Sequence, residues 1–314
     1  MSQKYRIWAA LITVYIVWGS TYLAIRFAVE SMPPFLMAAV RFLIAGSILF
    51  TWRWIAGDRR PSRREWRSAA IVGLLLLVGG NGGVVWAEQR VASGIAALMV
   101  GSAPLWMVTL DAIRPGGSRP NWQTIIGVVI GFLGIVLLVG PWQNTGQNGT
   151  LDTLGVLALL AAAFFWSIGS LYSRNAHLPD SPLLGTGMEM LAGGAGLLLL
   201  STLTGEWARL DVATISLKSV LSLAYLIVFG ALVGFTAYTW LLRVAPTPLV
   251  STYAYVNPIV ALYLGYMIGD EPLTLRIVAA ALIVVSSVAL INFSRAPTKK
   301  TESQLAASPI SGND

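Results

Sequence analysis

The sequence predicts an all-α polytopic membrane protein, with ten transmembrane helices arranged as two inverted five-helix repeats around a central cavity. Three observations support this prediction. The 314 residues are 56% hydrophobic and only 11% charged, which is far from the composition of a soluble domain. The apolar residues form continuous runs of about 20 residues, the length that an α-helix needs to cross the hydrocarbon core. One stretch of the first half also reappears, degraded, in the second half.

These runs are too long and too continuous for the alternating strands of a membrane β-barrel, so we expect helices. The first run follows Lys4 and Arg6 and continues to Phe27 without a cleavage site, so it is predicted to be a retained helix rather than a signal peptide. Only residues 88–90 mark a turn between the third run and the fourth. The ten expected spans are 7–27, 35–55, 67–87, 92–113, 123–140, 153–173, 183–203, 219–241, 248–268 and 275–293.

Basic residues in the connectors predict the orientation, because Lys and Arg accumulate on the cytoplasmic side of membrane proteins. With both termini in the cytoplasm, most of the 21 Lys and Arg residues fall on that side. The connectors of the other side keep only Arg90, Arg209, Lys218 and Arg276. The net charge of +7 is therefore interpreted as a topology signal, and no nucleic acid is expected as a partner.

An internal repeat divides the chain into two related halves. The first repeat is expected at residues 1–150 and the second at 151–295, followed by a disordered cytoplasmic tail at 296–314. Because each half holds an odd number of helices, the second half must enter the membrane from the opposite side, so the repeats are inverted. Shifting 18–46 onto 166–194 pairs Trp18 with Trp166, Arg26 with Arg174, Pro34 with Pro182 and Gly46 with Gly194.

Prolines occur near the middle of two corresponding spans. Pro104 in the fourth run and Pro258 in the ninth align when the repeat is extended. Each proline removes a backbone donor and frees a carbonyl one turn earlier, so we expect a kink or a break of the helix at bilayer depth. The alternative for each is an ordinary packed proline kink. Their matching positions favour a cavity lined by the freed carbonyls.

Arg41 and Glu189 are charged residues inside apolar runs, and they occupy equivalent positions in the two halves. Charges in this position are usually functional, so both are candidates for gating or coupling. Each lies about 9 Å from its own membrane face at 1.5 Å per residue, which leaves ~12 Å between them across the core. We therefore expect no direct ion pair. The alternative is that each side chain extends to the nearer headgroups.

Aromatic and polar residues in mid-span positions predict a substrate site, because they offer stacking surfaces and a few hydrogen bonds to an organic solute. For any single ring, helix packing is an equally valid explanation. Most of the other tryptophans lie near span ends and are typical of an interfacial belt. The expected substrate-binding residues are Trp18, Ser20, Tyr22, Asn81, Trp86, Ser102, Trp166, Tyr253, Tyr255 and Asn257.

Several kinds of chemistry lack their sequence signals. The chain has no cysteine and one histidine, and no phosphate-binding loop or metalloprotease motif, so neither a metal, a cofactor nor an ATPase activity is expected. An intramembrane enzyme would need a reactive cluster, and Glu189 is the one carboxylate expected deep within a run. Glu88, Arg90, Asp270 and Glu271 are interpreted as solvated charges of the connectors.

The order of motifs resembles the EamA-type transporters of the drug/metabolite transporter superfamily. The residues that carry the resemblance are the Trp18-Gly19 pair, Pro33-Pro34 followed by Arg41-Phe42 and Gly46, Pro104, Asn257-Pro258, and the acidic turn Gly269-Asp270-Glu271-Pro272. The resemblance covers about residues 7–293. One departure is that Asp111-Ala112-Ile113-Arg114 stands where relatives often carry a second acidic turn.

The resemblance implies export of amino acids or other small metabolites across the bacterial inner membrane by alternating access. Its partners would be a small-molecule solute, the lipid bilayer and either a coupling proton or an exchanged solute. Two alternatives remain open, an uptake carrier and a non-transporting scaffold or receptor. A scaffold would explain the helices but not the matched prolines.

Overall fold

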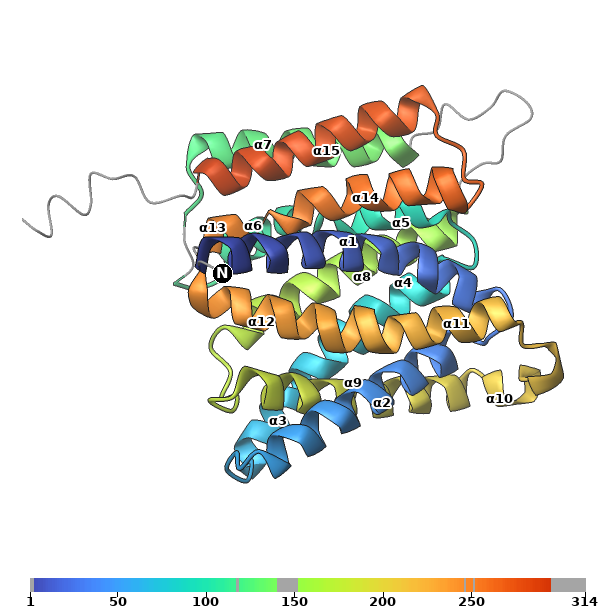
Figure 1. Ribbon diagram of the computed structural model, residues 1–314. Coiled ribbons are helices and arrows are strands. Elements are labelled where there is room, and N and C mark those ends of the chain that lie inside the picture. The colour runs from blue at the N-terminus through green and yellow to red at the C-terminus, as the bar shows by residue number, and fades with distance from the viewer. Residues whose placement is uncertain (1–2, 117–118, 140–151, 246, 251, 295–314) are drawn as a thin grey trace, which may run out of the picture.

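The computed structural model describes residues 3–116, 119–139, 152–245, 247–250 and 252–294, and every regular element in these ranges is a helix (Figure 1). Within them, nine helical spans are long and apolar enough to cross a membrane, and the shorter apolar helix Tyr253–Ile268 adds a tenth apolar segment. The expected all-helical membrane fold is therefore confirmed. The expected tail, residues 296–314, lies outside the described residues.

The first half contributes five spans, of which the third and fourth are composite. They are α1 (Gln3–Val29), α2 (Pro34–Ile55), the series α3 (Arg63–Gly73), η1 (Leu74–Asn81) and α4 (Gly82–Ala87), the pair α5 (Ser93–Val100) and α6 (Ala103–Ile113), and α7 (Trp122–Val139).

The second half repeats this order. It holds α8 (Thr153–Ser173), α9 (Pro182–Leu203) with the short α10 (Glu206–Arg209) and η2 (Val212–Thr214), the series α11 (Leu217–Tyr225), η3 (Leu226–Val233) and α12 (Gly234–Val244), the pair α13 (Thr247–Val250) and α14 (Tyr253–Ile268), and α15 (Leu275–Ser294). The segments η1 and η3 are both π-helical, and each lies in the third span of its half.

Local sequence explains where the helices begin. Pro34 and Pro182 occupy the first positions of α2 and α9, where the missing N–H is not needed and the fixed φ suits a helix. Ser62 caps α3: its hydroxyl accepts from the Glu65 N–H, and its own N–H donates to the Glu65 carboxylate at 2.7 Å. These local signals define the first residues of α2, α3 and α9.

The two halves pack on each other through matching sets of helices (Figure 1). The first helix, α1, contacts the third span of the second half (α11, η3 and α12) and also α14. Its counterpart α8 contacts the third span of the first half (α3, η1 and α4) and also α5 and α6. Further contacts between the halves join α2 with α9, α5 with α14 and α7 with α15, and α3 also packs on α9.

The bundle has two distinct ends. We call the end where α1 begins the N-terminal end and the end where α1 stops at Val29 the far end; they lie at the left and right of Figure 1. Asp152, just before α8, lies 3.8 Å from Arg90 in the connector between α4 and α5. That connector is at the far end, so α8 runs opposite to α1.

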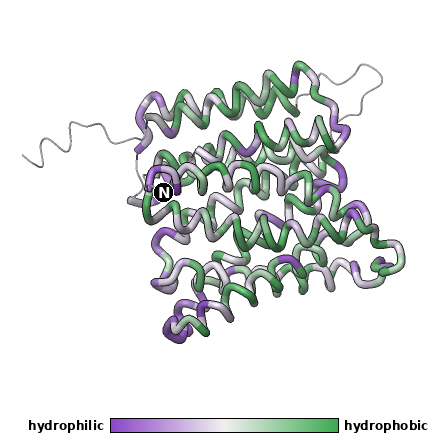
Figure 2. Tube along the Cα trace, in the orientation of Figure 1, coloured by the Kyte–Doolittle hydropathy of each residue, from purple (hydrophilic) through white to green (hydrophobic). Residues whose placement is uncertain are grey.

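Apolar side chains cover the outside of the bundle. Figure 2 shows hydrophobic residues along the helices and hydrophilic residues gathered at the two ends. Ile12 and Ile16 on α1 are exposed, as are Ile44 and Ile48 on α2, each pair one helical turn apart. Exposed apolar stripes of this kind suit contact with lipid.

The two prolines behave differently from each other. The fourth span is interrupted at Gly101 and Ser102, directly before Pro104 at the start of α6, so the expected break is present. At Pro258 the helix is not broken, because α14 runs through the proline. A Cβ added to Gly101 would lie 2.9 Å from the Pro258 ring, so the proline packs against the break in the other half. The helix therefore loses one backbone hydrogen bond at Pro258 without ending there.

Candidate functional site

Trp18 lies in an aromatic cluster formed by both halves. Its ring centroid is 5.3 Å from that of Tyr253, 5.0 Å from that of Tyr238 and 5.2 Å from that of Phe235. Edge-to-face and tilted rings at these distances stabilise one another beyond the area they bury. The structure thus brings together two expected site residues, Trp18 and Tyr253, and adds Tyr238 and Phe235, which the sequence analysis missed.

Each of the paired tryptophans packs on a π-helical segment of the other half. The indole Nε1 of Trp18 donates to the carbonyl oxygen of Gly230, within η3, at 3.2 Å. Trp166 lies against η1, where a Cβ added to Gly80 would meet its ring at 3.0 Å. Because π-helical turns are frequent at functional sites, these matched contacts mark the boundary between the halves as the candidate site.

The other expected polar residues have separate surroundings. The Ser20 hydroxyl lies 2.6 Å from the hydroxyl of Tyr225. Ser102 is buried at the break between α5 and α6, and its hydroxyl donates to the carbonyl of Met99. Asn81 ends η1, and its buried amide oxygen accepts no hydrogen bond from the described residues. Of these three, Asn81 keeps an acceptor free.

The remaining expected residues divide between the core and the far end. Tyr22 and Tyr255 pack against the main core cluster. The amide group of Asn257 lies 3.3 Å from the carbonyl oxygens of Tyr15 and Tyr253, so it joins α14 to α1. Trp86 is half-buried at the far end beneath Arg90, whose guanidinium is 4.3 Å from the ring centroid. Trp86 therefore stands apart from the Trp18 cluster.

Arg41 and Glu189 form no ion pair with each other in the described part of the chain. Arg41 is 4% exposed, and its Nε and Nη1 have no hydrogen-bond partner there. Its guanidinium approaches η3, because a Cβ added to Gly230 would lie 3.2 Å from Nη2. Glu189 lies on α9, with its backbone against Gly73 of α3. Each charge thus belongs to its own region of the bundle.

Glu271 is a buried hub at the far end, not a solvated loop charge as the sequence suggested. It is 7% exposed and its carboxylate pairs with Arg26 of α1 at 2.9 Å. The same carboxylate accepts the backbone N–H groups of Ser93 and Gly94, at 2.7 and 3.0 Å, where α5 begins. A carboxylate at a helix N-terminus compensates the positive end of the helix dipole. Glu271 therefore ties the start of the last span to α1 and α5.

Glu88 is the second correction among the connector charges. It directly follows α4 and is 3% exposed, and neither carboxylate oxygen accepts a hydrogen bond from any described residue. Burial raises the pKa of the Glu88 carboxyl well above its usual range, the charge of Glu271 raises it further, and Arg26 and Arg41 act in the opposite direction. Glu88 therefore lies within electrostatic reach of three charged groups.

Buried Glu206 borders a cavity of about 560 Å³ at the far end, which is also lined by Trp86, Gln89 and Arg209. Glu206 is 3% exposed, and its carboxylate accepts the backbone N–H groups of Phe35 and Leu36 at 3.1 and 2.8 Å. It thus holds the start of α2 in the first half to α10 in the second.

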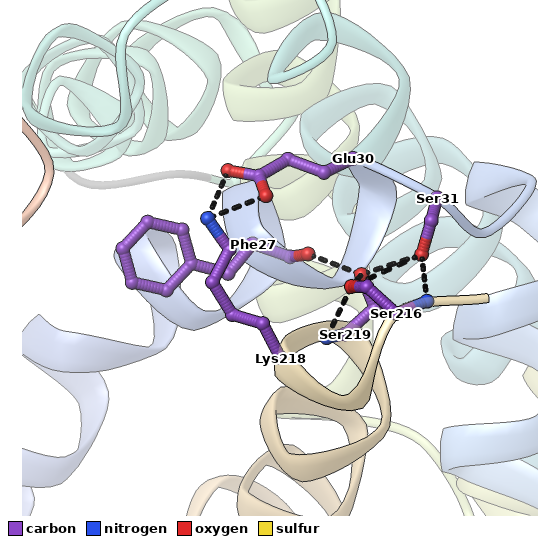
Figure 3. A network of polar contacts seen from close by, with 6 residues as sticks. All are labelled: Phe27, Glu30, Ser31, Ser216, Lys218 and Ser219. Carbon is purple, nitrogen blue, oxygen red and sulfur yellow. Dashed lines mark hydrogen bonds and ion pairs between the residues drawn. The ribbon is translucent and has the colours of Figure 1, made fainter. Parts of the chain in front are cut away.

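A surface network closes the same end between α1 and α11 (Figure 3). Lys218 pairs with Glu30 at 2.7 Å and lies 4.2 Å from the centroid of the Phe27 ring. The Ser219 hydroxyl donates to the Phe27 carbonyl at 2.7 Å and receives a hydrogen bond from Ser31 at 2.8 Å. The two halves are therefore joined at the far end by this network, by Glu206 and by Glu271.

One sequence signal was available for the missed carboxylates. Arg26 and Arg41 both lie in apolar runs, and charges in such positions usually have partners of opposite sign. Because Glu189 was placed too far away in depth, the acids beside neighbouring spans were the remaining candidates. Glu88 and Glu271 are these acids.

The family comparison agrees with this arrangement in two halves. The model of the EamA-like transporter family matches residues 6–140 and residues 153–293. The chain belongs to this family. An Escherichia coli protein named "Uncharacterized inner membrane transporter YedA" is 39% identical over 294 residues, which cover 93% of this chain and 92% of the relative. The EamA resemblance is thus confirmed, and the chain is a multi-pass membrane transporter.

More distant relatives cover most of this EamA-like chain. The Arabidopsis thaliana "WAT1-related protein At3g02690, chloroplastic" is 27% identical over 290 residues, 91% of this chain and 69% of the relative. The Bacillus subtilis "Uncharacterized transporter YoaV" is 22% identical over 295 residues, 92% of this chain and 97% of the relative. A solved crystal structure with 22% identity superposes with a TM-score of 0.60 over 92% of this chain and 96% of its own, which shows a shared fold.

Proposed function

We propose that this EamA-like protein is a secondary transporter that exports small organic metabolites, amino acids or related compounds, across the inner membrane by alternating access. The main support for the proposal is the way the two halves pack: α1 lies against the third span of the second half, and α8 lies against the third span of the first half. A pair of repeats related in this way encloses a shared site that opens to either side when the halves exchange roles. Such an exchange moves a solute without any further domain.

The opposite directions of α1 and α8 support inverted repeats at residues 1–150 and 151–295. The N-terminal end, together with both termini, is proposed to face the cytoplasm, and the basic residues of the connectors support this orientation. The far end then faces outward. Export is favoured over uptake by the EamA resemblance, and the solute assays below distinguish the two directions.

The substrate path is proposed to run past the Trp18 cluster, between η3 and the break before Pro104. Trp18 and Tyr253 offer ring faces to an organic solute, and Asn81 offers an unpartnered acceptor. Arg41 and Glu189 are proposed as gating or coupling charges on opposite sides of this path. The combination suits a solute with an apolar part and a few polar groups.

A growth screen followed by reconstitution tests the function. A strain that overexpresses the protein is challenged with amino acids, nucleobases and toxic metabolites, and each solute to which tolerance rises is then loaded into proteoliposomes. We expect the proteoliposomes to release the labelled solute faster than protein-free liposomes. Increased sensitivity to a solute would instead indicate uptake. No solute movement in either assay would leave a scaffold or receptor and contradict the proposal.

A further inference from the structure

The buried carboxyl of Glu88 has no role in the solute path described above. Three other acids at the far end have partners: Glu271 binds Arg26 and two backbone N–H groups, Glu206 binds two backbone N–H groups, and Glu30 binds Lys218. Glu88 is as buried as Glu206, yet neither of its oxygens has a hydrogen-bond donor among the described residues. An ionised carboxylate in such surroundings would be strongly destabilising.

Charged and titratable groups reach Glu88 from each neighbouring element. Arg26 and Tyr22 approach it from α1, Arg41 from α2 and Glu271 from the connector before α15. Arg26 is already paired with Glu271 at 2.9 Å. Arg41 has no hydrogen bond at Nε or Nη1 in the described part of the chain. Glu88 therefore faces one acid and two bases; the backbone of Arg26 also favours the ionised form, although no described residue donates a hydrogen bond to Glu88 with good geometry.

We infer that Glu88 is a proton-binding site of the transport cycle, which holds a proton while the far end is closed and releases it when that end opens to water. In the closed form the bound proton removes the negative charge that burial beside Glu271 disfavours. When water enters, hydration and the charges of Arg26 and Arg41 stabilise the carboxylate, and the proton leaves to the solvent on that side. The proton that leaves at the far end is replaced from the solvent at the N-terminal end when that end opens, so each cycle carries one proton from the N-terminal end to the far end.

This inference rests on the proposed transport function, so its first test does not require transport. The infrared carbonyl stretch of a protonated carboxyl group is recorded for the purified protein across a pH titration. We expect Glu88→Gln to remove one such band that is present in the wild type at neutral pH. Glu88→Asp, which keeps a carboxyl group, should retain a band. A wild-type spectrum at neutral pH that is unchanged by Glu88→Gln would overturn the inference.

The second test couples the site to solute movement. Proteoliposomes are given a pH difference of one unit and the solute identified by the growth screen. Because the proton leaves at the end to which the solute is exported, proton and solute move together, and for one proton per solute the wild type should accumulate the solute about tenfold on the basic side. Glu88→Gln should move the solute only down its own gradient. The control Asp211→Asn, which changes an exposed carboxylate of a connector at the same end, should accumulate it like the wild type.

The outcomes separate the two proposals. Accumulation by Glu88→Gln equal to that of the wild type, or loss of accumulation in Glu189→Gln alone, would overturn the role of Glu88 and leave the transporter intact. A wild type that moves no solute would overturn the transport function, and the infrared titration would still decide whether Glu88 holds a proton. If thermal unfolding in detergent shows that Glu88→Gln does not fold, the infrared titrations of the wild type and of Glu88→Asp are compared instead.

Discussion

Trp18 contributes both a ring and a hydrogen bond to the boundary between α1 and η3. Replacement with phenylalanine keeps a ring beside Tyr253 and removes the donor to Gly230, so we expect the free energy of unfolding to fall by about 1 kcal/mol. Replacement with alanine also removes the ring packing, and here we expect a loss of about 3 kcal/mol together with loss of solute flux. Unfolding titrations in detergent measure the first effect and proteoliposomes the second. Wild-type flux through Trp18→Ala would show that the ring only packs.

Glu271 and Glu30 both tie the halves together at the far end, but they differ in burial. Glu271→Ala leaves Arg26 unpaired and the start of α5 without its acceptor, so we expect a loss of about 3 kcal/mol in the free energy of unfolding. Glu30→Ala breaks an ion pair whose side chains are 42% and 50% exposed, and less than about 1 kcal/mol is expected. Comparable losses in the two variants would contradict the assignment of Glu271 as the hub.

Sequence reasoning found part of the candidate site at the level of residues. Trp18 and Tyr253 were selected because they are mid-span aromatics, and the structure places them in one cluster. Tyr238 was missed because its neighbours in the chain give no sign of which side of the helix meets α1. Glu88 and Glu271 were misread because a connector acid has the same sequence signal whether it is solvated or folded back onto neighbouring helices.

Close packing between α3 and α9 depends on glycine, and a matched pair of substitutions isolates this effect. A Cβ at Gly73 would overlap the backbone oxygen of Glu189, so the two helices would have to separate, and we expect Gly73→Ala to lose about 1–3 kcal/mol of stability. A Cβ at Gly185 on α9 would meet only Pro179, at 3.6 Å. Gly185→Ala should therefore be neutral or stabilising by up to about 1 kcal/mol, because alanine favours helix. Thermal unfolding of both variants in detergent decides the comparison.

The elements themselves could be predicted well, because span length and apolar runs depend only on local sequence and on the thickness of the bilayer. The predicted run 153–173 coincides with α8, and 35–55 differs from α2 by one residue. The π-helical turns of η1 and η3 were not predicted from the local sequence, and in the structure each lies against a tryptophan of the other half, Trp166 and Trp18 respectively. Pro258 shows the same limit: a local rule allows a break there, whereas α14 continues through the proline, which packs against Gly101 of the other half.

At the scale of the whole molecule, most of the contacts that close the far end connect one half to the other. Glu271 contacts α5, Glu206 contacts the start of α2, and Lys218 contacts Glu30. At the N-terminal end, by contrast, Arg59 reaches Asp180 only at 3.7 Å, with the Asp180 side chain 96% exposed. Opening the far end would therefore break buried contacts, whereas this ion pair at the opposite end is weak. Binding or release of a proton near Glu271 is one way to shift that balance.

The orientation of the whole bundle is open to a direct test because the native chain has no cysteine. Single cysteines at exposed Gln89 and Asp211 report on the far end, and those at exposed Arg60 and Asn175 report on the N-terminal end. If the basic connectors face the cytoplasm, a membrane-impermeant maleimide should label Gln89→Cys and Asp211→Cys in intact cells, and the other two only after permeabilisation. Labelling of Arg60→Cys or Asn175→Cys in intact cells would show that the bundle has the opposite orientation in the membrane. The export direction would then have to be reconsidered, because Glu88 would release its proton on the cytoplasmic side.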